Sequence, residues 1–184
     1  LGQCILTKGI KIDKLSTFDI EYLFLNVRGK SVGETVDIKV TCPDDGVTTV
    51  PVTVDLDAIQ VTFDPEHDKD IILDDKLKMR MKYPSLDEFI KENFQVDNVG
   101  FEQSIEMIAT CVDMIYSEEE TWTSADFTQK EMIDFLEGLG SKQFKELEKF
   151  FTTMPKLTHE IKVTNPKTKK ENTIKLEGLA AFFN

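Results

Sequence analysis

The chain has 184 residues, and 34 acidic against 22 basic side chains give it a formal net charge of −12 at pH 7. A surface this acidic is repelled by nucleic acid and by anionic membranes, so neither is an expected partner. Hydrophobic residues make up 40% of the chain, yet no apolar run reaches the ~18 residues that a membrane span requires. We expect one globular domain over residues 1–184 with no membrane span.

The chain begins at Leu1, without an initiator methionine and in sequence that reads as the middle of a helix. We therefore expect a native N-terminal segment before it. Cys4, Cys42 and Cys111 are odd in number and far apart, which is typical of a protein from a reducing compartment and not of a disulfide scaffold.

The first predicted helix covers "TFDIEYLFLNVRGK" at residues 17–30, with Ser16 or Thr17 as its cap and Asp19 in its acidic first turn. Its apolar side chains fall almost all round the helix. That distribution predicts a central, buried helix.

Strands follow. Apolar residues alternate with polar ones in "ETVDIKVTC" and "TTVPVTVDL", on either side of the turn sequence "PDDG", so residues 34–55 are predicted to form a β-hairpin. The segment "DIILDDKLKMRMKY" predicts a second hairpin with Asp74 and Asp75 at its tip.

After Pro84 the pattern becomes helical. Ser85 and Glu88 form a capping-box pair for "LDEFIKENF", and a second pair is Thr128 with Glu131 before "QKEMIDFLEGL". Between these segments an apolar series recurs at helical spacing: Phe101, Ile105, Ile108, Val112 and Ile115.

"GLGS" separates "QKEMIDFLEGL" from "KQFKELEKFFTTM", so residues 128–154 are predicted to form an αα-hairpin. We expect this hairpin to pack on the helix at 17–30.

Beyond Pro155, "LTHEIKVTN" and "ENTIKL" flank "PKTKK" as a further hairpin at residues 157–176, and "EGLAAFFN" predicts a short last helix. The order of elements predicts an α+β fold of mainly antiparallel β-hairpins packed with about five helices.

The two hairpin tips "TCPDDG" at 41–46 and "TNPKTKK" at 164–170 have the outline of a zinc ribbon. Zinc needs four ligands in a tetrahedron, and Cys42 is the one thiol at the tips. Asp45 or Gly46, Asn165 and Lys169 stand where the other ligands would fall, and a protonated lysine is a poor ligand. We expect zinc-ribbon-like tips that lack metal ligands, with no metal and no cofactor.

The sequence has no phosphate loop, dinucleotide-binding glycine pattern or nucleophile elbow, and its two histidines lie in unrelated contexts. The acidic run in "YSEEETW" is typical of a solvated face. We therefore expect no catalytic residues and no small-molecule substrate.

Candidate partner-binding residues remain. Phe182 and Phe183 lie almost at the end of the sequence, where they either plug the core or form a docking tail. Glu118, Glu119 and Glu120 are candidates for steering a basic partner.

Five segments carry a resemblance that covers nearly the whole chain: "TFDIEYLFLNVRGKSVGE", "YPSLDEFIKENF", "CVDMIYSEEETW", "FLEGLGSKQFKELEKFFTTMP" and "IKLEGLAAFFN". In their order and spacing the chain resembles the baseplate hub assembly protein family of T-even-type bacteriophages, the myovirus base plate proteins. Some relatives look as if they carry cysteine pairs at the two hairpin tips, and this sequence departs from them by keeping only Cys42.

The resemblance implies a non-enzymatic assembly factor or structural component of the baseplate hub of a contractile tail, docking onto other hub proteins. It implies work in the host cytoplasm during assembly, with retention in the virion left open. The competing hypothesis is a small hub-associated hydrolase using a carboxylate pair, because some tail hubs carry cell-wall hydrolases. A third, an acidic DNA mimic, rests on charge alone.

Overall fold

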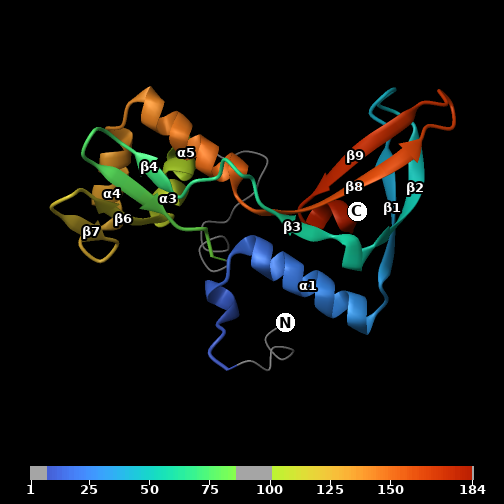
Figure 1. The fold of residues 1–184 in the computed structure, drawn as a ribbon, viewed down its shortest axis with the longest axis horizontal. Coiled ribbons are helices and arrows are strands. Elements are labelled where there is room, and N and C mark those ends of the chain that lie inside the picture. The colour runs from blue at the N-terminus through green and yellow to red at the C-terminus, as the bar shows by residue number, and fades with distance from the viewer. Residues whose placement is uncertain (1–7, 86–100, 184) are drawn as a thin grey trace. The chain divides into compact units, whose positions relative to one another are not determined.

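The computed structural model describes residues 8–85 and 101–183, whose helices and strands are drawn in Figure 1. They belong to two compact units: unit 1 (Leu1–Ile12, Phe18–Thr62 and Pro155–Asn184) and unit 2 (Asp13–Thr17 and Phe63–Met154). Each unit has a cluster of buried apolar side chains of its own. Helices and antiparallel strands occur in both, so the predicted α+β class is confirmed.

Unit 1 is built on two antiparallel hairpins (Figure 1). β1 (Thr35–Thr41) pairs with β2 (Thr49–Asp55) over its whole length. β8 (Lys156–Thr164) pairs with β9 (Glu171–Glu177), and the short β3 (Gln60–Thr62) lies along the other side of β8. Both hairpins occur where the alternation of apolar residues predicted them.

The core of unit 1 is formed mainly by the inward residues of these strands. Two 3-10 helices, Leu56–Ala58 and Leu179–Phe182, add side chains to it. Its buried members are Leu25, Ile38, Val40, Cys42, Val54, Leu56, Ile59, Leu157, Ile161, Val163, Leu176 and Phe182.

The first helix, α1 (Thr17–Ser31), is not the fully buried helix that its composition predicted. Leu25 and Gly29 are buried, whereas Tyr22 and Phe24 are 41% and 39% exposed. A helix beside a sheet buries one stripe of residues, and apolar side chains off that stripe stay at the surface. The prediction of a helix buried on all sides is therefore wrong. Composition shows that the helix is apolar, but it does not show which stripe of the helix packs against the sheet.

Unit 2 contains a four-stranded antiparallel meander in which sequence neighbours pair. Its strands are β4 (Asp70–Ile72), β5 (Lys78–Met81), β6 (Val112–Tyr116) and β7 (Thr121–Thr123). The predicted second hairpin is confirmed as β4 and β5, with its acidic tip between them.

Helices α3 (Phe101–Thr110), α4 (Gln129–Glu137) and α5 (Ser141–Thr153) supply the rest of unit 2's core. The capping box that opens α4 is confirmed. The backbone N–H of Glu131 donates to the Thr128 hydroxyl at 3.3 Å, and the Thr128 N–H donates to the Glu131 carboxylate at 2.7 Å.

The predicted αα-hairpin is confirmed as α4 and α5, and its buried residues pack in the core of unit 2. Leu136 of α4 and Leu147 of α5 are fully buried in the same cluster as Met79 of β5 and Ile105 of α3. Leu25 of α1 belongs to the core of unit 1. The hairpin covers the apolar face of the four-stranded sheet, which offers a broader apolar surface than one helix stripe does.

The helix predicted from the apolar series Phe101 to Ile115 is confirmed only in its first part. The helix ends at Thr110, and Val112 begins strand β6. The Lys82 N–H donates to the carbonyl of Cys111 at 2.7 Å, and from there the chain pairs with β5. Periodicity over so short a run fits helix and strand alike, and pairing with β5 decides between them.

Ser85 is buried and forms an isolated antiparallel bridge with Ser16. Its predicted capping partner Glu88 and the helix predicted at "LDEFIKENF" fall on residues 86–100, outside the described residues. The residues that the structure describes, 8–85 and 101–183, contain four α-helices and three 3-10 helices. Within residues 8–85 and 101–183, no helix is both long enough and apolar enough to cross a membrane.

Candidate protein-docking site

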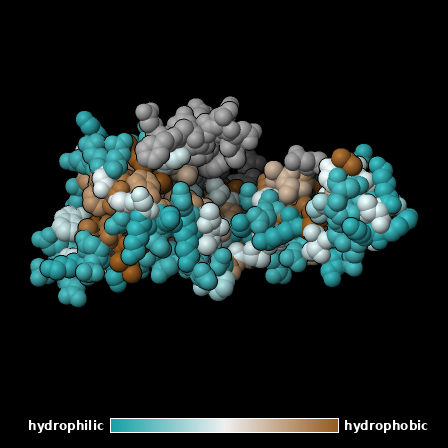
Figure 2. Space-filling model, turned by 90° about the horizontal axis from the view of Figure 1, so that it is seen from above, coloured by the Kyte–Doolittle hydropathy of each residue, from teal (hydrophilic) through white to brown (hydrophobic). Residues whose placement is uncertain are grey.

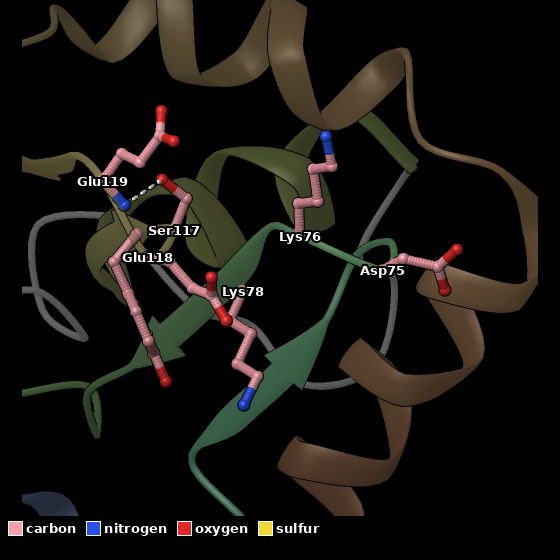
Figure 3. Close-up of a pocket in the computed structure, with 7 residues that line it drawn as sticks. Asp75, Lys76, Lys78, Ser117, Glu118 and Glu119 are labelled. Atoms are coloured by element: carbon pink, nitrogen blue, oxygen red, sulfur yellow. Dashed lines mark hydrogen bonds between the residues drawn. The ribbon is translucent and has the colours of Figure 1, made fainter.

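Two turns close the same end of the four-stranded sheet of unit 2. Residues 73–77 join β4 to β5, and residues 117–120 join β6 to β7. The pairing of Lys78 with Tyr116 makes the two turns neighbours at that end (Figure 3).

Short polar side chains shape both turns. Asp74 accepts hydrogen bonds from the N–H groups of Lys76 and Leu77 at 2.7 and 2.8 Å, and these bonds hold the pKa of its carboxyl below the usual value. In the second turn the Ser117 hydroxyl accepts from the N–H groups of Glu119 and Glu120 at 3.2 and 3.1 Å. The serine hydroxyl therefore fixes the backbone of the turn that carries Glu118, Glu119 and Glu120.

A pocket of about 580 Å³ lies between the two turns. Lys76 and Lys78 line it from the β4–β5 turn and the start of β5, and Ser117, Glu118 and Glu119 line it from the β6–β7 turn (Figure 3). The side chain of Asp75 points away from the other labelled residues in the same view. The pocket carries charges of both signs.

On the helix side of the same sheet there is a second, apolar hollow of about 320 Å³, which we call the Trp122 groove. Its lining residues are Leu77, Ile115, Trp122, Phe127, Glu131, Met132 and Phe135. They come from the β4–β5 turn, strands β6 and β7, and helix α4 with its approach.

The strand register explains why the groove is open. Ile71, Met79, Ile115 and Trp122 are successive partners across the four strands, so they lie in one row on the helix-covered face. The first three are buried at 4%, 0% and 7% exposure, whereas Trp122 is 38% exposed. The helix layer thus covers the row up to β6 and leaves its last member accessible on the edge strand.

The outer edge of β7 is already occupied at Thr123. Its backbone N–H donates to the Asp126 carboxylate at 2.7 Å, and its carbonyl accepts from the Asp126 N–H at 2.9 Å. The Thr123 hydroxyl also donates to that carboxylate, and these bonds lower the pKa of Asp126. Such a closed edge disfavours the addition of a further strand there.

The opposite face of the sheet carries an ion pair beside a tyrosine. Arg80 donates two hydrogen bonds to Asp70 at 2.7 Å each, and its guanidinium lies 5.7 Å from the ring centre of Tyr116. The arginine lowers the pKa of the Asp70 carboxyl, while burial and that carboxylate raise the pKa of the Tyr116 hydroxyl. Figure 2 shows unit 2, at the left, as hydrophilic atoms interrupted by brown apolar atoms.

The predicted acidic residues lie beside this site. Glu118, Glu119 and Glu120 are exposed in the β6–β7 turn, directly before the strand that carries Trp122. Sequence reasoning missed the groove itself. The available signal was the chain's single tryptophan placed among polar residues in "ETWTS".

The predicted phenylalanine pair lies in the other unit, and its two rings differ. Phe182 is fully buried in the core of unit 1. Phe183 is 37% exposed, its ring 6.0 Å from that of Phe24 in an edge-on contact and 4.9 Å from the guanidinium of Arg28. The two rings and Glu118–Glu120 therefore do not form one site within a unit.

The hairpin tips of unit 1 are joined by side-chain hydrogen bonds. The carboxylate of Asp44 accepts from the Asn165 amide at 2.8 Å and from the Thr168 hydroxyl, and these bonds lower its pKa. The Asp44 N–H donates to the side-chain oxygen of Asn172 at 3.1 Å. We call this network the tip lock. It ties the β1–β2 turn to the β8–β9 turn.

The residues at the predicted ligand positions take other roles. Cys42 is fully buried, and burial raises the pKa of its thiol. Asp45 accepts bonds from the N–H and hydroxyl of Thr48 at 2.9 and 2.5 Å, closing its own turn. Lys169 and Gly46 take positive φ angles of 64° and 67° at the two turns. Among residues 8–85 and 101–183, no three metal-ligating side chains gather into a possible metal site.

A family of proteins described as the T4 bacteriophage base plate protein matches residues 1–184, the whole chain. A search of curated proteins gave no match, and neither did a search of solved structures.

Proposed function

This chain belongs to the T4 bacteriophage base plate protein family, and on that premise we propose that it is a non-enzymatic assembly factor or structural component of the baseplate hub. It acts by docking onto other hub proteins, in the host cytoplasm during assembly and in the baseplate of the tail. The whole-chain family match is the observation that carries this proposal.

The distribution of charge supports a docking function. Unit 2 contains 23 acidic and 11 basic residues, a formal charge of −12, whereas unit 1 has 11 of each and is neutral. The entire net charge of the protein is therefore concentrated in one unit. Charge gathered in this way speeds and orients encounter with a basic partner.

The surface of unit 2 supplies the second feature that docking needs. Its acidic β6–β7 turn borders the apolar Trp122 groove. Protein interfaces commonly combine a buried apolar centre rich in aromatic residues with a polar, charged rim.

Co-expression tests the proposal. We expect the tagged chain, produced together with each of the other baseplate proteins of the same phage in turn, to recover at least one hub protein in a fixed ratio. Recovery should fall as salt rises from about 0.05 to 0.5 M, because salt screens the acidic surface.

Failure to recover any baseplate protein at low salt would overturn the docking function. A purified chain that cleaves cell-wall glycan would instead support the hydrolase hypothesis, with a pair of carboxylates as its catalytic groups.

A further inference from the structure

We propose that the Trp122 groove is the docking site for a basic segment of another baseplate protein, which inserts one large apolar side chain beside Trp122. The inference rests on the docking function proposed above, and it adds the surface, the chemistry of the partner and the mode of binding.

The groove is built to take an apolar anchor. Its volume of about 320 Å³ is at the lower end of the range of protein pockets, which suits one large side chain better than a whole helix. The walls are aromatic and aliphatic apart from Glu131, whose carboxylate is held by the α4 capping box. Partly exposed tryptophan in such a setting is a frequent centre of binding energy.

The surroundings of the groove select a basic partner. Residues 117–131 contain five acids, Glu118, Glu119, Glu120, Asp126 and Glu131, against one base, Lys130. They also lie in the unit that accounts for the whole net charge of the protein, −12. A segment with lysine or arginine beside its apolar anchor would meet complementary charge at this rim.

A second copy of this chain fits less well, because it carries the same net charge of −12 and is repelled. Its basic segments are residues 8–14, with Lys8, Lys11 and Lys14 beside the 46% exposed Ile10, and the β8–β9 turn, where Lys167, Lys169 and Lys170 are exposed. The turn sequence "NPKTKK" has no large apolar side chain. The β8–β9 turn therefore supplies complementary charge without the large apolar anchor that the groove would hold.

Binding by strand addition is also disfavoured. Both backbone groups of Thr123 are bonded to Asp126, so β7 offers little free edge. Insertion of a side chain uses the groove without needing that edge.

The single tryptophan makes the groove directly observable. The full chain is labelled with 5-fluorotryptophan, which gives one ¹⁹F signal, from position 122. Unlabelled baseplate proteins of the same phage are added one at a time, and complex formation is followed in parallel by sedimentation velocity. We expect the partner that forms a complex to shift or broaden the ¹⁹F signal in proportion to the complex formed.

Two variants probe the anchor. Trp122→Ala should weaken the complex by at least about 10-fold, as expected for a residue at the centre of an interface. The matched control is Ile72→Ser, since Ile72 is 63% exposed on the opposite face of the same sheet. The control should bind like the unaltered chain, and far-UV circular dichroism checks that both variants are folded.

A second pair of variants probes charge. Glu118→Lys with Glu119→Lys should weaken the complex several-fold at low salt, and the difference should shrink at high salt. Glu160→Lys with Glu171→Lys makes the same change in net charge on exposed positions of unit 1. This control should have a smaller effect.

The outcomes separate the two proposals. A complex that sediments normally while the ¹⁹F signal stays unchanged overturns the groove and leaves the docking function standing. A ¹⁹F shift that grows with the concentration of this chain alone identifies a second copy as the occupant and overturns the proposal. Absence of a complex with every baseplate protein overturns both.

Discussion

Neighbouring residues with the same side chain can have opposite environments, as Phe182 and Phe183 show. The ring of Phe182 is fully buried in the core of unit 1, and that of Phe183 is 37% exposed against Phe24 and Arg28. The core-plug alternative therefore describes Phe182. A role in partner binding stays a prediction, and it is one that an accessible ring such as Phe183 can test.

Single substitutions separate the two rings better than deletion of the last residues, which would remove both. Phe182→Ala should cost about 3–5 kcal/mol of unfolding free energy, because it leaves a cavity in the core. Phe183→Ala should cost about 0.5–1.5 kcal/mol, the range of an edge-on aromatic contact. Chemical denaturation measures both.

The same variants test the partner role. If Phe183 anchors a hub protein, Phe183→Ala reduces recovery of that protein while the chain remains folded. Equal recovery with Phe183→Ala and with the unaltered chain would contradict the anchor.

At the scale of elements, the tip lock joins two hairpins through side-chain hydrogen bonds. Asn165 is fully buried and joins the turns by donating to Asp44, while its side-chain oxygen accepts from the N–H groups of Lys167 and Thr168 at 2.8 and 3.3 Å. These hydrogen bonds fix the distance between the two tips.

Asn165→Ala should therefore lower the unfolding free energy by about 1–3 kcal/mol, because it leaves buried polar groups without partners. Thr173→Ala, at an exposed position of β9, is the matched control and should change it by no more than about 0.5 kcal/mol. We expect a chelator to leave the melting temperature of the unaltered protein unchanged. A melting temperature that falls with chelator would show that a metal contributes.

At the scale of the whole molecule, the buried residues form two separate clusters, one in each unit. The sequence predicted a single domain over residues 1–184. Two cores predict two unfolding transitions, since no buried side chain among residues 8–85 and 101–183 belongs to both clusters.

The position of Trp122 makes this prediction measurable. Its fluorescence reports on unit 2, whereas far-UV circular dichroism follows the strands and helices of both units. We expect the two signals to give different midpoints in denaturant. Leu147→Ala, at a fully buried position of unit 2, should lower the stability of the fluorescence transition by about 2–5 kcal/mol. Coincident transitions that move together would show that the chain unfolds as one domain.

Local patterns in the sequence were sufficient for the hairpins and for the capped helix α4. The alternation in "ETVDIKVTC" and "TTVPVTVDL" and the pairing of Thr128 with Glu131 depend on neighbours within a few residues. Such signals fix the element because turn and cap chemistry is local. The resemblance in whole segments also identified the family that matches the complete chain.

Only the tertiary structure shows what each apolar face packs against. The αα-hairpin packs on the four-stranded sheet, and the chain changes from helix to strand after Cys111 because it pairs with β5 there. The tertiary structure also leaves Trp122 partly exposed at the end of a row whose other members are covered. A side chain's burial depends on residues far away in the sequence, so periodicity can show that an apolar face exists without showing its partner. The Trp122 groove exists because the helix layer ends before it reaches β7. No local pattern in the sequence shows where on the sheet the helices stop.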